Sequence, residues 1–147
     1  MAGYSGKALV VKLGIKKGTR VAALGSPVAY EELVGKLPDG AQVATSLRRA
    51  VDFLHFFTKS ESELRKMFPK LKQSVDESGM LWVSWPKRAS KVTTDLDENV
   101  VREIGLAAGL VDVKVCAVNE TWSGLKFVYR VKDRKGRSVG ESERGDD

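Results

Sequence analysis

Residues 79–130 read GMLWVSWPKRASKVTTDLDENVVREIGLAAGLVDVKVCAVNETWSGLKFVYR, and this stretch decides the fold. It contains all three tryptophans and the only cysteine of the chain. Its hydrophobic pattern predicts a strand over Met80–Trp85, then a polar loop and a helix. Two further strands are predicted over Val111–Val118 and Leu125–Val131, and the polar turn between them predicts an antiparallel hairpin.

Local signals predict where the helices begin. Ser60 and Glu63 form a capping box. Pro69 lies inside the helix that follows and should kink or split it, because proline lacks the N–H that the ladder needs. Two further helix starts are predicted from the same kind of signal, one at Ser26-Pro27 and one at Asp95 with Glu98.

Apolar segments between these helices predict the rest of the sheet. A short helix that ends near Gly14 comes first, followed by strands over Thr19–Gly25, Ala41–Ser46 and Val51–Phe57. Strands that alternate with helices predict an α/β protein, a Rossmann-like three-layer sandwich with a mostly parallel sheet and a C-terminal antiparallel hairpin. We expect one domain over residues 1–131 and a disordered charged tail over residues 132–147.

The composition suits one soluble domain and excludes some classes of protein. The chain has 147 residues and a net charge of +6, which permits an anionic partner without requiring one. It has no apolar run of the roughly 18–20 residues that a membrane span needs. The single cysteine, Cys116, allows no intramolecular disulfide and fits a reducing compartment, so we expect a cytoplasmic protein.

The order of elements over residues 8–131 resembles a reduced class I methyltransferase fold, whose last two strands form such a hairpin. The resemblance implies a cofactor site with a glycine-rich turn after the first strand and an acidic residue at the end of the second. Here the turn offers only Gly25 and places Pro27 at the helix start, and the second strand ends Val43-Ala44-Thr45-Ser46 without a carboxylate. These differences disfavour S-adenosylmethionine, and also a dinucleotide, so we expect no cofactor.

A second resemblance covers most of the chain. The segments that carry it are Leu81–Lys87, Thr94–Leu96, Gly109–Ala117 and Thr121–Phe127. They read LWVSWPK, TDL, GLVDVKVCA and TWSGLKF, and together they resemble a bacterial domain family of unknown function. This resemblance implies no activity.

The carboxyl ends of the parallel strands predict a ligand-binding edge. In an open α/β sheet, ligands bind beyond these ends, and the hairpin turn follows a strand that runs the same way. Polar groups and two tryptophans are expected to converge there. The candidate ligand-binding residues are Ser26, Trp85, Lys87, Arg88, Asn119 and Trp122. Alternatively, the tryptophans mainly pack the sheet and the loop residues are solvated.

No complete catalytic motif is present. His55 and Glu120 are candidates for a general base, although His55 can equally be a strand residue bonded to a neighbour. Asp52 cannot orient His55, because side chains three residues apart on a strand point to opposite faces. Cys116, among valines, is expected to be an inert buried thiol. One histidine and one cysteine cannot make a typical zinc site, so no metal is expected.

These observations favour a non-catalytic binding or interaction module whose partner is a protein or a small anionic ligand. One alternative is a divergent group-transfer enzyme that uses the same edge of the sheet. A second alternative is nucleic-acid binding through the loop Trp85–Lys91, in which three cations follow a tryptophan that could stack on a base.

Overall fold

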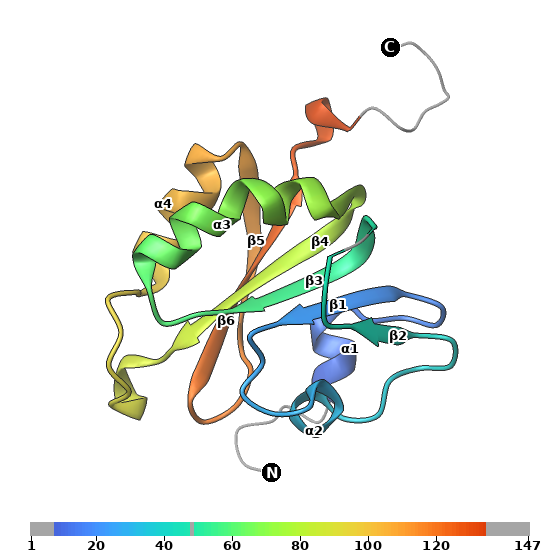
Figure 1. Ribbon diagram of the computed structural model, residues 1–147, viewed down its shortest axis with the longest axis horizontal. Helices are drawn as coiled ribbons and strands as arrows, with labels where there is room; N and C mark the ends of the chain where they lie inside the picture. Colours follow the sequence, from blue (N-terminus) through green and yellow to red (C-terminus); the bar gives the residue numbers. More distant parts are fainter. Residues whose placement is uncertain (1–7, 48, 135–147) are drawn as a thin grey trace.

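The computed structural model describes residues 8–47 and 49–134, which build one six-stranded sheet (Figure 1). The strands are β1 (Arg20–Leu24), β2 (Gln42–Ala44), β3 (Val51–Phe57), β4 (Val75–Pro86), β5 (Leu110–Ala117) and β6 (Trp122–Tyr129). Their order in the sheet is β2-β1-β3-β4-β6-β5. The first four strands are parallel, and β6 is antiparallel to both β4 and β5. The predicted α/β class, with a C-terminal antiparallel hairpin, is confirmed.

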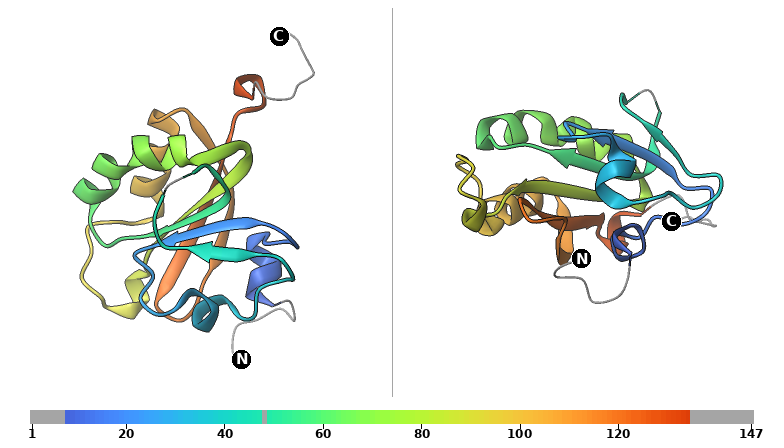
Figure 2. Two further views of the ribbon diagram at one scale, coloured as in Figure 1. Left: turned by 45° about the vertical axis from the view of Figure 1, so that its right-hand side comes forward. Right: turned by 90° about the horizontal axis from the view of Figure 1, so that it is seen from below.

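Helices cover both faces of the sheet (Figure 2). They are α1 (Leu9–Leu13), α2 (Tyr30–Val34), α3 (Glu61–Ser74) and α4 (Glu98–Ala107). We call the two sides the α3/α4 face and the α1/α2 face. Phe56, Val83 and Leu125 pack on the α3/α4 face, whereas Phe53 and Trp82 pack on the α1/α2 face. Side chains that alternate along each strand therefore supply two cores. Among the described residues, no helix has the length and apolar character to cross a membrane.

One helix start was predicted well and two were not. The Ser60 hydroxyl accepts from the Glu63 N–H at 3.1 Å and caps α3, which continues through Pro69 without being split. The N-cap of α4 is Asp97, not Asp95. Asp95 instead accepts from the N–H of Glu61 at 2.7 Å, so it caps α3 from a loop 34 residues away.

The helix predicted to start at Ser26-Pro27 begins later. α2 starts at Tyr30, after the N-cap residue Ala29, and it has five residues. The Ser26 hydroxyl donates to the carbonyl oxygen of Val28 at 2.6 Å and closes a local turn instead of capping the helix. The predicted cap is therefore wrong, because a hydroxyl bond within the turn replaces it.

β4 is longer than predicted and begins directly after α3. Val75 pairs with Val51, and the register then shifts before Phe53 pairs with Met80. Gly79 lies inside this irregular part of the strand and does not precede the strand. A Cβ atom at Gly79 would lie 2.5 Å from the carbonyl oxygen of Asp52, so the close approach of β3 explains the glycine.

The hairpin forms as predicted, but β6 begins at Trp122, three residues earlier than expected. Trp122 pairs with Pro86 and its carbonyl oxygen accepts from the N–H of Val118 at 2.9 Å, so the ladder extends to the turn. Val131–Asp133 form a short 3-10 helix after β6. The charged tail predicted over residues 132–147 lies, from residue 135 onward, outside the described residues.

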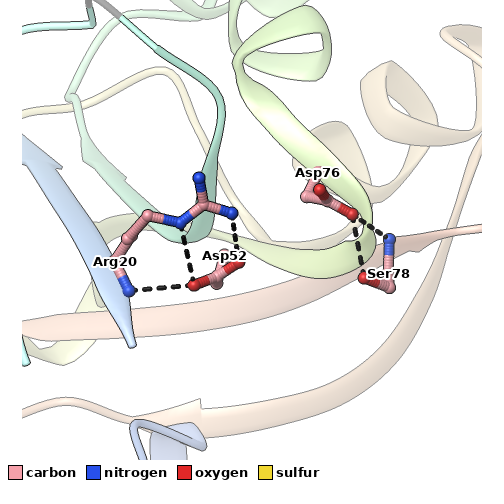
Figure 3. A network of polar contacts seen from close by, with 4 residues as sticks. All are labelled: Arg20, Asp52, Asp76 and Ser78. Carbon is pink, nitrogen blue, oxygen red and sulfur yellow. Dashed lines mark hydrogen bonds and ion pairs between the residues drawn. The ribbon is translucent and has the colours of Figure 1, made fainter. Parts of the chain in front are cut away.

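At the amino end of the sheet Arg20 pairs with Asp52, and Asp76 is bonded to Ser78 (Figure 3). The Arg20 guanidinium reaches both carboxylate oxygens of Asp52, at 2.9 and 3.3 Å, and the Arg20 backbone N–H donates to the same carboxylate. Hydrogen bonds from Arg20 lower the pKa of Asp52. Asp76 accepts from both the N–H and the hydroxyl of Ser78. The first contacts join the amino ends of β1 and β3, and the second is local to the start of β4.

Candidate functional site

The carboxyl ends of the strands meet at one edge, which we call the rim. The N–H of Lys87, at the end of β4, donates to the carbonyl oxygen of Thr121 in the hairpin turn at 2.7 Å. The ends of β1 and β3 also approach closely, because a Cβ atom added at Gly25 would lie 2.6 Å from the carbonyl oxygen of Phe57. The topology therefore brings the predicted residues Ser26, Lys87, Arg88 and Asn119 to the same edge of the sheet.

The two tryptophans expected at the rim are core residues. Trp85 is 4% exposed and packs on the α3/α4 face. Trp122 is 9% exposed, packs on the α1/α2 face and meets Phe57 edge to face, with 5.5 Å between ring centroids. The rings lie on opposite faces of the sheet, and neither presents a free face to a ligand. The alternative interpretation, that these tryptophans pack the sheet, fits this arrangement, and stacking of a base on Trp85 does not.

His55 is enclosed in the α1/α2 core. Its Nδ1 lies 2.6 Å from the Tyr30 hydroxyl, its Nε2 lies 2.7 Å from the Ser84 hydroxyl, and its ring stacks on Phe57 with 4.1 Å between centroids. Burial lowers the pKa of His55 to about 3, and burial also raises the pKa of Tyr30. The imidazole is therefore neutral at pH 7, fully buried and bonded at both nitrogens, so it cannot act as a general base at the rim.

Asn119 and Glu120, in the hairpin turn, have different roles. The Asn119 side-chain carbonyl oxygen accepts from the N–H groups of Thr121 and Trp122, both at 2.8 Å. This side chain therefore holds the turn, and its amide nitrogen is left for other contacts. Glu120 is exposed and forms no ion pair with a described residue. It is the accessible candidate base, but no described histidine or nucleophile is hydrogen-bonded to it.

A hollow of about 380 Å³ lies in the loop that follows β4. Its lining residues are Arg88, Lys91, Val92, Thr94, Asp95, Leu96 and Asp97. The two aspartates are engaged as helix caps, Asp95 on the N–H of Glu61 and Asp97 on the N–H of Val100. Arg88 and Lys91 are exposed, and their side chains make no hydrogen bond or ion pair with a described residue. We call this the rim hollow.

The backbone at Lys91 sets it apart from its surroundings. Its φ of 62° is left-handed, and no other described residue except glycine has a positive φ. The 3-10 helix Arg88–Ser90 precedes it, and the Ser90 hydroxyl donates to the carbonyl oxygen of Lys87 at 2.7 Å. A lysine is seldom retained in this conformation, so the position is a candidate for a functional residue. No local signal in the sequence predicted it, because residue type does not reveal a positive φ when the residue is not glycine.

The residues at the usual cofactor positions do not fit S-adenosylmethionine. Gly25 is explained by its left-handed φ of 76° and by the carbonyl oxygen of Phe57, which an added Cβ atom would meet at 2.6 Å. Pro27 has no N–H to donate, and α2 begins three residues later. The end of β2, at Thr45 and Ser46, offers hydroxyl groups but no carboxylate to accept from ribose hydroxyls. Among the described residues no group of three or more His, Cys, Asp or Glu side chains could hold a metal ion.

Comparison with known proteins identifies the fold. No protein-family model and no curated protein matches the chain. The resemblance to a bacterial domain family therefore stays a prediction.

Solved structures do match. A SAM-dependent methyltransferase from Aquifex aeolicus aligns with a TM-score of 0.56 and 18% identity, over 80% of this chain and 86% of that one. A DhpI–SAH complex aligns with a TM-score of 0.60 and 12% identity, over 84% and 83%. A ribosomal protein L11 methylase from Lactobacillus delbrueckii subsp. bulgaricus aligns with a TM-score of 0.55 and 10% identity, over 82% and 74%. At these identities the likeness concerns the fold alone, and it shows that the chain has a methyltransferase-like Rossmann fold.

Proposed function

We propose that the chain is a non-catalytic binding module which holds a small anionic ligand, with a phosphate or carboxylate group, in the rim hollow. One observation carries the proposal. The side chains of Arg88 and Lys91 line the hollow without a partner among the described residues, while both aspartates beside them are engaged as helix caps. A guanidinium and an ammonium at one hollow suit an oxyanion, since the guanidinium can bind two oxygens at once.

The position of the hollow supports the same proposal. It lies next to the carboxyl end of β4, where open α/β sheets bind their ligands. A second hollow, of about 300 Å³, lies at the other end of the sheet and is lined by Arg20 and Arg49 among others. Arg20 is already paired with Asp52 there, so Arg49 is the one cation lining that hollow without a partner among the described residues, against two in the rim hollow.

The lack of an accessible acid–base pair among the described residues favours binding over group transfer. His55 is sealed between Tyr30 and Ser84. Glu120 is exposed to water, and its neighbour Asn119 is committed to the turn. Group transfer to an acceptor that must lose a proton would need a base near the bound substrate, and the described part of the rim offers no such constellation.

Thermal unfolding, followed by tryptophan fluorescence, tests the proposal. The probes are pyrophosphate, ATP, citrate and S-adenosylmethionine, each with the wild type, Arg88→Ala/Lys91→Ala and the control Lys66→Ala. Lys66 is an exposed residue of α3. A ligand at about a hundred times its dissociation constant stabilises the fold by roughly 2.7 kcal/mol, which is several degrees. We expect a shift with an anion that the double variant loses and the control keeps. A shift with S-adenosylmethionine alone would instead support the alternative that the chain is a group-transfer enzyme.

We further infer that the module works in the cytoplasm. The single cysteine, Cys116, is buried, and its thiol contacts the carbonyl oxygen of Ala117 at 3.4 Å. A chain that uses no disulfide fits a reducing compartment.

A further inference from the structure

Three lysines gather on the α1/α2 face, on the opposite side of the sheet from α3. Lys114 in β5 and Lys126 in β6 are direct partners in the antiparallel ladder, so their side chains project from the same face. Lys126 is also the ladder partner of Trp82, which packs in the α1/α2 core. Lys16, just after α1, lies close enough to Lys126 for its charge to lower the pKa of Lys126. We call Lys16, Lys114 and Lys126 the lysine patch.

The patch has positive charge that no described carboxylate balances. The Lys114 ammonium donates to the carbonyl oxygen of Lys12 at 2.8 Å, which holds it over the last turn of α1. Lys126 is half-buried, and its ammonium group makes no hydrogen bond or ion pair with a described residue. Asp112, two residues before Lys114, is the ladder partner of Phe127 on the α3/α4 face and pairs there with Arg102. Two like charges opposite each other in a ladder are destabilising, and so is a desolvated ammonium.

The charged form of Lys126 is the one that this arrangement destabilises. Its pKa is lowered by burial first, and then by the charges of Lys114 and Lys16. An anion placed among the three ammonium groups would offset both effects through its attraction to the positive charges. A fold that keeps three cations together, with no described acid among them, is therefore better suited to a bound anion than to the free state.

We propose that the lysine patch binds the phosphate backbone of a nucleic-acid duplex, without reading its sequence. The patch lies on the surface of two strands, and its lysines line neither of the two hollows described above. An open group of three cations on a strand surface suits an extended polyanion better than a small enclosed ligand.

The surroundings of the patch favour a duplex over single strands. The exposed large apolar side chains of the described residues are valines and one leucine, with no aromatic ring among them. Single-strand binding relies on bases stacked on aromatic side chains, which the described surface does not offer. Backbone contacts from lysines carry no sequence information by themselves. The inference uses none of the residues of the rim hollow and stands independently of the proposed function.

Fluorescence anisotropy with a labelled 20-base-pair DNA duplex of arbitrary sequence tests this inference, at several salt concentrations. The test variant is Lys114→Gln/Lys126→Gln, and the control is Lys66→Gln/Lys70→Gln, which removes two charges from exposed positions of α3. Non-specific binding is expected at dissociation constants of about 10⁻⁴ to 10⁻⁶ M at physiological salt. We expect the test variant to bind on the order of tenfold more weakly and its salt slope to fall by about two.

Thermal unfolding gives a readout that does not depend on binding. Because Lys126 is partly desolvated and faces like charges, Lys126→Gln should fold normally and raise Tm at low salt. Equal loss of duplex binding in the control would mean that overall charge, not the patch, is responsible, and would overturn the inference. So would wild-type protein that fails to bind the duplex at about 50 mM salt, where non-specific binding is strongest, but binds vesicles containing phosphatidylserine.

Discussion

The two ends of the central strands differ in whether their basic side chains are paired with carboxylates. At the amino end, the Arg20 guanidinium is matched by Asp52 in a bidentate pair. At the carboxyl end, Arg88 and Lys91 face the rim hollow, while the carboxylates beside them are used as helix caps. The first arrangement is complete without a ligand. The second leaves two cations in a concave site without an ion-pair partner among the described residues, at the edge where this kind of sheet binds its ligands.

The comparison separates charged residues that hold the fold from charged residues that are available to bind. Sequence alone does not distinguish Arg20 from Arg88, because each is one basic residue near the end of a strand. The difference lies in what the neighbouring elements supply. Asp52 reaches Arg20 across 32 residues, whereas Asp95 accepts from the N–H of Glu61 and is not paired with Arg88.

The middle of β3, between these two ends, should dominate the response to pH. Burial lowers the pKa of His55 from 6.5 to about 3, so the folded state resists protonation while the unfolded state accepts it. The contribution of neutral His55 to the free energy of unfolding is therefore complete above pH 6.5. It falls by about 1.4 kcal/mol per pH unit between pH 6.5 and about 3. Urea unfolding at pH 7, 6 and 5 measures this slope.

A matched variant shows whether His55 causes this pH dependence. His55 is the only histidine of the chain, so His55→Gln should remove the slope between pH 6.5 and about 5, where aspartates and glutamates are still ionised. A wild type with constant stability over that range would contradict the burial of a neutral imidazole.

Two glycines test the close packing at either end of β3. Gly79→Ala would place a Cβ atom 2.5 Å from the carbonyl oxygen of Asp52, and Gly25→Ala would place one 2.6 Å from that of Phe57. Overpacking of this kind costs roughly 1–3 kcal/mol. Gly25→Ala should cost about 1 kcal/mol more, because its φ of 76° is left-handed.

Gly18→Ala is the control for that pair. Its φ is 71°, but nothing lies within 4 Å of the added Cβ atom, so only the backbone strain of about 1 kcal/mol remains. Denaturant unfolding gives the three free energies. A loss at Gly25 equal to that at Gly18, together with no loss at Gly79, would show that conformation alone, and not contact with β3, sets the cost.

Asp52→Asn tests the ion pair with Arg20 at the amino end of the sheet. The side chains of Arg20 and Asp52 are 58% and 39% exposed, so water screens the ion pair and its loss should destabilise the fold less than either crowded glycine substitution. Arg20 lowers the pKa of Asp52, so this contribution is present above pH 3.8 and is lost as the pH falls below it. The difference between wild type and variant should also shrink at about 1 M NaCl, as seen by urea unfolding. A difference that is independent of salt would point to lost packing instead.

The sequence was most informative where local pattern decides the structure. The limits of β3, the cap at Ser60 and the C-terminal hairpin follow from alternation and from a capping box, which depend on residues a few positions apart. The rim was predicted in part, because strand direction alone brings Lys87 and Asn119 together. The errors arose where a distant partner decides. Trp85 and Trp122 pack into the two cores, and Asp95 caps a helix 34 residues away.

Lys91→Gly gives the smallest effect and the sharpest contrast between stability and binding. Glycine adopts a φ of 62° without strain, so the variant should gain up to about 1 kcal/mol of stability although it loses a side chain. It should at the same time weaken the thermal shift with the anion that binds the rim hollow, because one of the two cations that line the hollow is gone. The variant would thus be more stable than the wild type without ligand and less responsive to ligand. Unfolding curves with and without pyrophosphate measure both quantities. If stability fell and the shift were unchanged, the left-handed lysine would be a structural feature of the loop, and the cations at the rim would need another explanation.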